Sequence, residues 1–374
     1  MTEIRSKLKG KYYVDVGAIV LVEAQSKTDE SSSQSSVADF NHATSFAGEA
    51  LFLVDVLGRT LLEHIVDRLL RAEVKVASLV VHPDVAKSIP PFHGSLANLN
   101  VCVTDDPWTA VPRILDGYCN NGCDCAFVVK PTAYVEADLP DLLDFHRQEE
   151  RALTRASDTE GPLDLWVMNC DPNSESFEDS LRGALLQPDF FPASYFVKQY
   201  AQRISHAQDL RRLATDAFLA RCRLRPAGEQ LRPGVWADQG VQLSRGARIV
   251  GPAYLGARCT IGERSVITRF SSIERDSYID YGTVVENSSV LPNTYVGMWL
   301  DVRRSVVHGN RLLNLERGVL VEVSDPRLLH ATDAAGQAKR MPAPVPTRTY
   351  ESSPPRTNIV DRIRSVSTST EFES

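Results

Sequence analysis

Residues 243–285 read LSRGARIVGPAYLGARCTIGERSVITRFSSIERDSYIDYGTVV, and every sixth position from Leu243 is aliphatic. The series consists of Leu243, Ile249, Leu255, Ile261, Ile267, Ile273, Ile279, Val285 and, beyond the quoted stretch, Leu291. At an apolar fraction of 43%, nine such residues in a row arise by chance about 5 times in 10,000 in a given register. The period therefore reflects a repeating structure.

A small side chain follows each aliphatic residue by four positions, with Tyr295 the exception. A period of six fits neither a straight α-helix nor a plain strand, but it suits a coil with flat sides that each take one hexad. The aliphatic residue then points inward, and the small residue lets the chain turn a corner. The hexads from Leu243 to Val296 predict about three coils of a parallel β-helix. Because apolar residues continue six apart at Leu300, Val306 and Leu312, we expect the β-helix to span residues 233–323.

The N-terminal half alternates strand and helix patterns. Strands are predicted over residues 16–22, 76–81, 101–104 and 126–129, and helices over residues 60–72, 110–118 and 139–151. Such alternation predicts a parallel sheet covered on both faces. We expect a Rossmann-like α/β domain over residues 14–185, and a helical connection with two helices over residues 186–232.

Three segments have compositions that do not favour a packed core. Residues 1–13 are predicted to be an N-terminal extension, and the Ser-rich residues 24–47 a flexible loop. Residues 324–374 are rich in Pro, Ser and Arg and are predicted to be a disordered tail.

Charge and cysteine content restrict the function. Lys and Arg number 41 against 48 Asp and Glu, a formal net charge of −7, which argues against binding to nucleic acid or to an anionic membrane. The sequence contains no apolar run of 18 residues and no apolar signal core near its beginning, so no membrane span is expected and a cytoplasmic location is predicted. The seven cysteines are scattered and odd in number, which favours reduced thiols.

Residues 53–64, LVDVLGRTLLEH, precede the first predicted long helix, and an α/β region followed by hexapeptide coils surrounds them. This combination resembles the sugar-nucleotide pyrophosphorylases, the sugar-1-phosphate nucleotidyltransferases that make an NDP-sugar and pyrophosphate. The resemblance covers roughly residues 14–325 and implies a nucleotidyltransferase domain and a left-handed β-helix. In that family a Gly-rich loop, a basic residue and an Asp-bound Mg²⁺ neutralise the phosphates. Arg59 matches a family position that commonly carries Lys or Arg.

The chain departs from the family where the chemistry is done. The loop after the first strand, Glu23 to Thr28, contains no glycine and adds a carboxylate. Leu51 stands where the family has its Lys, and Ala133 stands where the family has its metal-binding Asp. Substitutes within reach are Lys27 and Lys130 as catalytic cations, Arg59 and Lys130 for substrate binding, and Glu136 and Asp138 for a metal.

These departures favour a catalytically degenerate protein, a regulatory or scaffolding subunit in nucleotide-sugar or polysaccharide metabolism. No cofactor is then required, although a nucleotide or nucleotide sugar remains a possible ligand. The alternative is an active, Mg²⁺-dependent pyrophosphorylase. A hexapeptide acyltransferase is a minor alternative, because such enzymes use a His and His308 lies near the end of the coils, with none between Leu243 and Trp299.

The outer faces of the coils suggest contacts with other molecules. Their aromatic residues predict a homo-oligomer or a paralogous enzyme partner that binds through the β-helix. Near the later coils Arg269, Arg275, Arg303 and Arg304 either solvate the surface or form an anion site.

Overall fold

The structure is a computed structural model that describes residues 15–23, 45–46, 49–72, 74–87, 89, 99–170, 193–332 and 357–358. The described residues divide into two compact units. The N-terminal unit takes its residues from 1–44 and 61–205, and the C-terminal unit from 45–60 and 206–374. Residues 45–60, which sequence analysis assigned to the α/β domain, therefore group with the coils. The predicted extension 1–13, Lys27 and most of the Ser-rich segment lie outside the described residues.

Seven described strands of the N-terminal unit form one sheet in the order β12-β10-β11-β8-β1-β6-β7. Its parallel part consists of β1 (Val16–Val22), β6 (Val76–Val81), β7 (Asn100–Val103) and β8 (Cys125–Val129). The predicted strands are confirmed. The hairpin of β10 (Leu153–Asp158) and β11 (Gly161–Asn169), which sequence analysis did not predict, pairs antiparallel with β8, and β12 (Ser194–Phe196) forms the edge.

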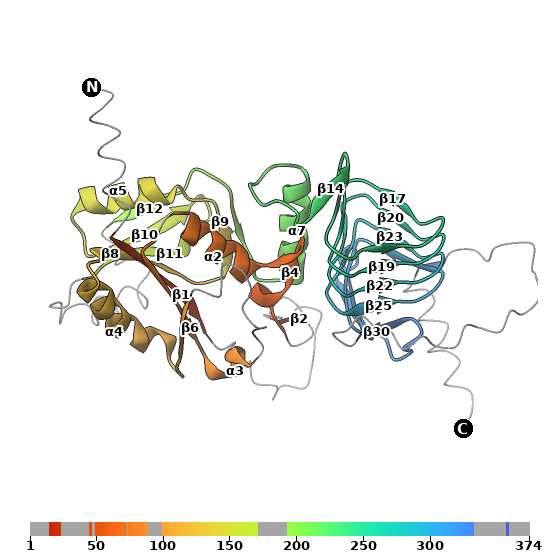
Figure 1. Ribbon diagram of the computed structural model, residues 1–374, viewed down its shortest axis with the longest axis horizontal. Helices are drawn as coiled ribbons and strands as arrows, with labels where there is room; N and C mark the ends of the chain where they lie inside the picture. Colours follow the sequence, from red (N-terminus) through yellow and green to blue (C-terminus); the bar gives the residue numbers. More distant parts are fainter. Residues whose placement is uncertain are drawn as a thin grey trace, which may run out of the picture. The chain divides into compact units, whose positions relative to one another are not determined.

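Helices cover both faces of this sheet, as the pattern predicted (Figure 1). Helix α4 (Pro107–Asn120) packs on the face that carries Ile19 and Leu21. On the other face α2 (Leu61–Arg71) and α5 (Leu139–Glu149) lie against Val129. Every side chain of β1 is buried, because alternate residues face opposite helices. A short helix, α3 (Pro83–Ala86), follows β6.

The topology places a switch point between β1 and β8. From β1 the chain continues outward to β6 and β7, and it then crosses to β8 on the opposite side of β1. In open α/β sheets ligands bind beyond the carboxyl ends of the strands at such a point. Here those ends lead into Glu23 and Lys130.

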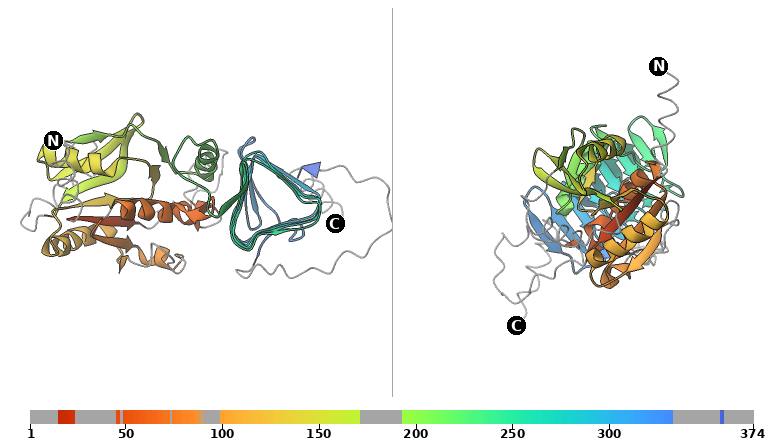
Figure 2. Two further views of the ribbon diagram at one scale, coloured as in Figure 1. Left: turned by 45° about the horizontal axis from the view of Figure 1, so that its top comes forward. Right: turned by 90° about the vertical axis from the view of Figure 1, so that its left-hand side faces the viewer.

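The C-terminal unit contains three stacks of mostly parallel strands, which form the three sides of a triangular coil (Figure 2). The first stack is β14 (Glu229–Arg232), β15 (Val235–Ala237), β18 (Ala253–Leu255), β21 (Ser271–Ile273), β24 (Ser289–Val290), β27 (Ser305–His308), β28 (Arg311–Asn314) and β29 (Val319–Glu322). The second is β16 (Gln242–Leu243), β19 (Thr260–Ile261), β22 (Tyr278–Ile279), β25 (Thr294–Val296) and β30 (Leu329–Ala331). The third is β17 (Arg248–Val250), β20 (Val266–Thr268), β23 (Val284–Glu286), β26 (Leu300–Arg303) and β31 (Thr357–Asn358).

The coil register changes once. Val235 pairs with Ala253, 18 residues further on, but Ser272 pairs with Ser289, only 17 residues further on. Val290 therefore takes the interior position that sequence analysis assigned to Leu291, and the interior series continues through Val296, Val302 and Val307. The predicted lapse of the register after Val296 is thus a shift by one residue.

The small residues do more than make room at the corners, because their hydroxyls join successive coils. Thr283 Oγ1 donates to the carbonyl of Gly297 and accepts from the N–H of Leu300 at 3.0 Å. Ser288 Oγ accepts from the N–H of Ser305, also at 3.0 Å. These hydroxyls satisfy backbone groups at corners where no sheet partner exists.

The connection between the units differs from the prediction. Within residues 193–232 the chain forms β12, β13 (Ala201–Arg203), a single helix α7 (Ala207–Phe218) and β14, in place of two helices. Strand β13 pairs with β9 (Ala133–Val135), because its short extended segment satisfies the backbone of that strand.

The beginning of the predicted tail is also ordered differently from the prediction. Strand β30 pairs antiparallel with β25 and closes the end of its stack, and β31 pairs with β26, which contradicts the predicted disorder at these positions. Residues 333–356 and 359–374 lie outside the described part of the chain. No helix among the described residues is long and apolar enough to cross a membrane.

Residues 45–60 form short elements: β2 (Ser45–Phe46), β3 (Glu49–Ala50), the 3₁₀ turn η2 (Leu51–Leu53), and the hairpin of β4 (Asp55–Val56) and β5 (Arg59–Thr60). Leu57 and Gly58 connect β4 to β5 with φ of 56° and 94°. Positive φ at both central residues is the requirement of a type I′ hairpin, which explains the glycine.

Candidate functional site

The carboxyl ends of β1 and β8 are joined by an ion pair. Glu23, the first residue after β1, places a carboxylate oxygen 2.8 Å from Nζ of Lys130, the first residue after β8. The indole N–H of Trp108 in α4 donates to the other Glu23 oxygen. Glu23 thus occupies, with two donors, the place at the switch point where a phosphate group would approach.

The neighbouring strand end is cross-linked in the same manner. Asp164 in β11 accepts from Arg155 Nη2 at 3.0 Å and from the hydroxyl of Thr132 at 2.7 Å. Arg155 also lies over the Trp166 ring, 5.2 Å from its centroid. Both Lys130 and Arg155 therefore have carboxylate partners from their own chain.

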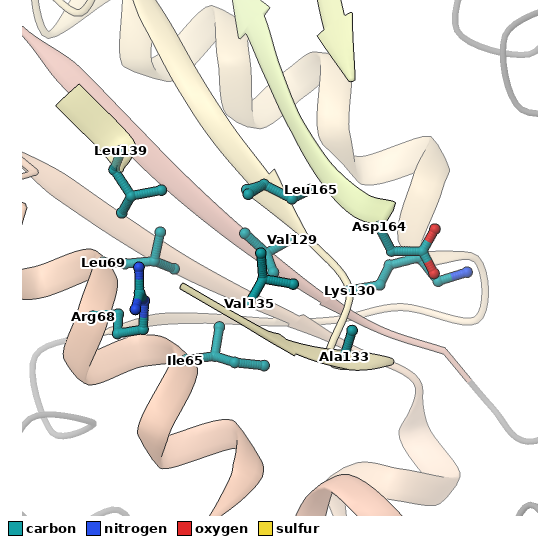
Figure 3. A pocket seen from close by; sticks show the side chains of 10 residues that line it. All are labelled: Ile65, Arg68, Leu69, Val129, Lys130, Ala133, Val135, Leu139, Asp164 and Leu165. Atoms are coloured by element: carbon teal, nitrogen blue, oxygen red, sulfur yellow. The ribbon is translucent and has the colours of Figure 1, made fainter. Parts of the chain in front are cut away.

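A small cavity lies behind these residues, between the sheet and helices α2 and α5. Its volume is about 30 Å³, enough for about two water molecules and too small for a nucleotide. Figure 3 shows mostly aliphatic side chains around it, with Lys130 and Asp164 on one side and Arg68 on the other. Arg68 donates to the carbonyl of Ala137 at 2.6 Å, so its guanidinium holds the chain before α5.

The residues proposed to bind a metal are engaged in local contacts. Glu136 is buried and accepts from the Tyr134 hydroxyl at 3.1 Å. Asp138 caps α5 and accepts from the N–H of Asp141 at 3.3 Å. Within the described ranges no group of three or more His, Cys, Asp and Glu could hold a metal ion.

The remaining predicted positions are spread over both units. Ala133 is buried in β9 of the N-terminal unit, and Leu51 is buried in η2 of the C-terminal unit. Arg59 is exposed on β5, also in the C-terminal unit. The structure therefore brings Lys130 together with Glu23 and Trp108, which sequence analysis did not propose as partners.

A second cluster of charged residues is buried in the C-terminal unit, and the sequence contained no signal for it. Glu274, just after β21, accepts from the N–H groups of Leu57 at 3.1 Å and Gly58 at 2.9 Å. Arg275 forms an ion pair with Asp55, whose side chain is inaccessible to solvent. These bonds attach the β4-β5 hairpin to the coil.

Burial changes the acid–base properties of this cluster. Burial, reinforced by the charge of Asp55, raises the pKa of Glu274 to about 8. Burial also raises the pKa of the Tyr254 hydroxyl, which is enclosed without a hydrogen-bond partner among the described atoms. A Cβ on Gly58 would lie 2.0 Å from that hydroxyl, so the hairpin packs directly on Tyr254.

Two comparisons with known proteins complete the description of the site. A scan against protein-family models gives no match, and a search of curated proteins gives no significant relative. The argument for function therefore depends on the geometry of the chain itself.

Proposed function

We propose that this protein is a sugar-nucleotidyltransferase-like protein without transferase activity, and that it acts as a regulatory or scaffolding subunit in nucleotide-sugar or polysaccharide metabolism. In this proposal the N-terminal unit is a Rossmann-like nucleotidyltransferase domain and the coils form a left-handed β-helix. The observation that carries the proposal is the ion pair between Glu23 and Lys130.

The ion pair opposes phosphate binding in two ways. A triphosphate that approached Lys130 would have to displace an anchored carboxylate, and it would meet negative charge where transfer chemistry requires cations. Phosphoryl transfer depends almost entirely on positioning and charge neutralisation, so the loss of those cations removes most of the catalysis.

The coils are proposed to supply the working surface for a second copy of the chain or for a paralogous enzyme. Tyr278 stacks on Tyr295 with ring centroids 5.7 Å apart, and Tyr295 packs against His330 at 4.4 Å. The two tyrosines are partly exposed on the outside of one coil face. Rigid aromatic side chains of this kind are enriched in protein interfaces. A cytoplasmic location forms part of the same proposal.

A ligand panel tests the proposal. The full-length protein is heated with nucleoside triphosphates, sugar 1-phosphates or nucleotide sugars, each with and without Mg²⁺, and pyrophosphate release is assayed in parallel. We expect no Mg²⁺-dependent shift in Tm with a triphosphate and no pyrophosphate release. A Mg²⁺-dependent shift together with release that Lys130→Gln abolishes would establish the active pyrophosphorylase instead.

A further inference from the structure

Arg211 in α7 is a buried cation for which the described residues supply no counterion. Its side chain is in a residue only 5% exposed, and Nη2 donates to the amide oxygen of Asn287 at 2.7 Å. Its other terminal nitrogen, Nη1, is enclosed and has no hydrogen-bond partner in the described chain. No described carboxylate lies within ion-pair distance of it.

Burial lowers the pKa of Arg211 to about 10, and no neighbouring charge contributes to that shift. The guanidinium is nevertheless protonated at neutral pH. An unpaired buried charge is costly, and proteins ordinarily pair it or use it to bind an ion. The structure therefore lacks an anion at this position.

A cleft opens beside Arg211 within the C-terminal unit. Its volume is about 510 Å³, within the range of small-molecule sites. It is lined by one face of α7 and by the later coils, and the lining includes Arg212, Thr215, Asn287 and Arg304. Arg212 and Thr215 lie three residues apart on the helix and so face the same side.

The charges in the cleft do not cancel. Two of its arginines have carboxylate partners: Arg221 binds Asp216 at 3.1 Å, and Arg304 binds Glu316 at 2.7 Å. Arg211 and the exposed Arg212 have no such partner in the described chain. The lining therefore carries four guanidinium groups against two carboxylates, a net charge of about +2.

We propose that this cleft binds a small phosphate monoester, whose dianion is the counterion of Arg211 and Arg212. A phosphate monoester carries a charge of about −1.5 to −2 at pH 7, which matches the net charge of the lining, whereas a carboxylate matches only half of it. Guanidinium groups recognise phosphate oxygens through paired N–H donors. The remaining volume accommodates the organic part of the ester.

Such a ligand acts as an effector of the C-terminal unit. It contacts α7 and the coils simultaneously, so its binding free energy stabilises their packing. This site shares no residue with the strand ends of the N-terminal unit, and it stands or falls independently of the function proposed above.

Isothermal titration of the full-length protein with glycerol 3-phosphate tests the proposal, with glycerol and with sodium chloride of equal ionic strength as matched titrants. We expect saturable binding of one glycerol 3-phosphate per chain and none of glycerol. Arg212→Gln, at an exposed position, is expected to weaken binding at least fivefold. Arg211→Met is expected to abolish binding without lowering Tm, since it removes an uncompensated buried charge. Arg248→Gln, at an exposed position on β17 outside the cleft, serves as the control and is expected to bind like the wild type.

Either of two results would overturn the proposal. One is the absence of saturable binding up to 10 mM glycerol 3-phosphate, a concentration on the order of ten times a millimolar Kd. The other is an equal loss of affinity in Arg212→Gln and Arg248→Gln, which would indicate general screening by surface arginines. If Arg211→Met fails to fold, the comparison of the two glutamine variants still decides the question.

Discussion

The carboxylate of Glu23 lies 2.8 Å from the ammonium of Lys130, across the ends of two adjacent parallel strands. These two residues are 107 positions apart in sequence, yet the switch in strand order between β1 and β8 brings them together. The pair occupies the part of an open α/β sheet that usually receives a ligand. It is the point from which loss of transferase chemistry follows.

Removal of this carboxylate is expected to restore anion binding at the strand ends. In Glu23→Gln, Lys130 loses its counterion and the local charge rises by one unit. We expect inorganic pyrophosphate to bind about tenfold more tightly than to the wild type, equivalent to about 1.4 kcal/mol. Isothermal titration at low salt measures the change, and Glu149→Gln, at an exposed position on α5, is the control. Equal affinities in the wild type and Glu23→Gln would show that Glu23 does not block the site.

The inward isoleucines are expected to carry much of the stability of the coils. Ile267 is fully buried, so Ile267→Ala removes apolar contacts and leaves a cavity that rigid backbone coils cannot close. We expect a loss of about 3 kcal/mol in the free energy of unfolding, measured by urea titration with hydrogen exchange of the coil amides. Leu243 belongs to the same sequence repeat but is 49% exposed, so Leu243→Ala is expected to cost less than about 1 kcal/mol. Similar losses in both variants would contradict the interior assignment.

The corner hydroxyls are expected to matter independently of their size. Thr283→Val keeps the shape of the side chain but leaves the carbonyl of Gly297 and the N–H of Leu300 without the hydroxyl. A loss of about 1–3 kcal/mol in unfolding free energy is expected, because both backbone groups remain buried. Thr260→Val, at a partly exposed position on β19, is the matched control and should change stability little. If the two valine variants were equally stable, the bridging role would be wrong.

Glu274 is expected to make the stability of the C-terminal unit depend on pH. Its pKa in the folded protein is raised to about 8, above the ordinary value of 4.5, so the folded state binds more protons between these two pH values. Stability contributed by protonated Glu274 is therefore fully present below about pH 4.5 and is lost as pH rises through about 8. Charged groups beside it include Asp55 and Arg275.

Urea titrations from pH 5 to pH 9 measure this dependence. In Glu274→Gln the side chain remains neutral and retains one oxygen acceptor for the hairpin, so the decline with pH is expected to flatten. Glu263→Gln, at an exposed position of the same coil region, should keep the wild-type profile. A Glu274→Gln profile that coincides with that of the wild type would refute the role of this carboxyl group.

Elements with a strong local period were predictable. The strands over residues 16–22 and 76–81 agree with β1 and β6 at both ends, and the helix predicted over residues 60–72 differs from α2 by one residue at each end. Short strands with no period were missed, including β12 and β13, because two or three residues carry too little pattern.

The site was less predictable than the fold. Lys130 was singled out because it follows a strand, but its partnership with Glu23 depends on which strands lie side by side. The cluster of Asp55 and Glu274 had no signal at all, since the Glu274 carboxylate meets the Leu57 N–H across 217 positions of sequence. Likewise Arg211 was indistinguishable from any other helical arginine until its burial was known.

The sequence by itself determined the coil, since a side chain every six residues must point inward wherever three flat sides enclose a core. It also determined the alternation of strands and helices in the N-terminal unit. Only the tertiary structure decided that Val290 replaces Leu291 in the interior, that residues 45–60 join the coils, and that Glu23 meets Lys130. The physical reason is that periodicity reports which face of a segment is buried, whereas charge pairing and register depend on contacts between segments far apart in the chain.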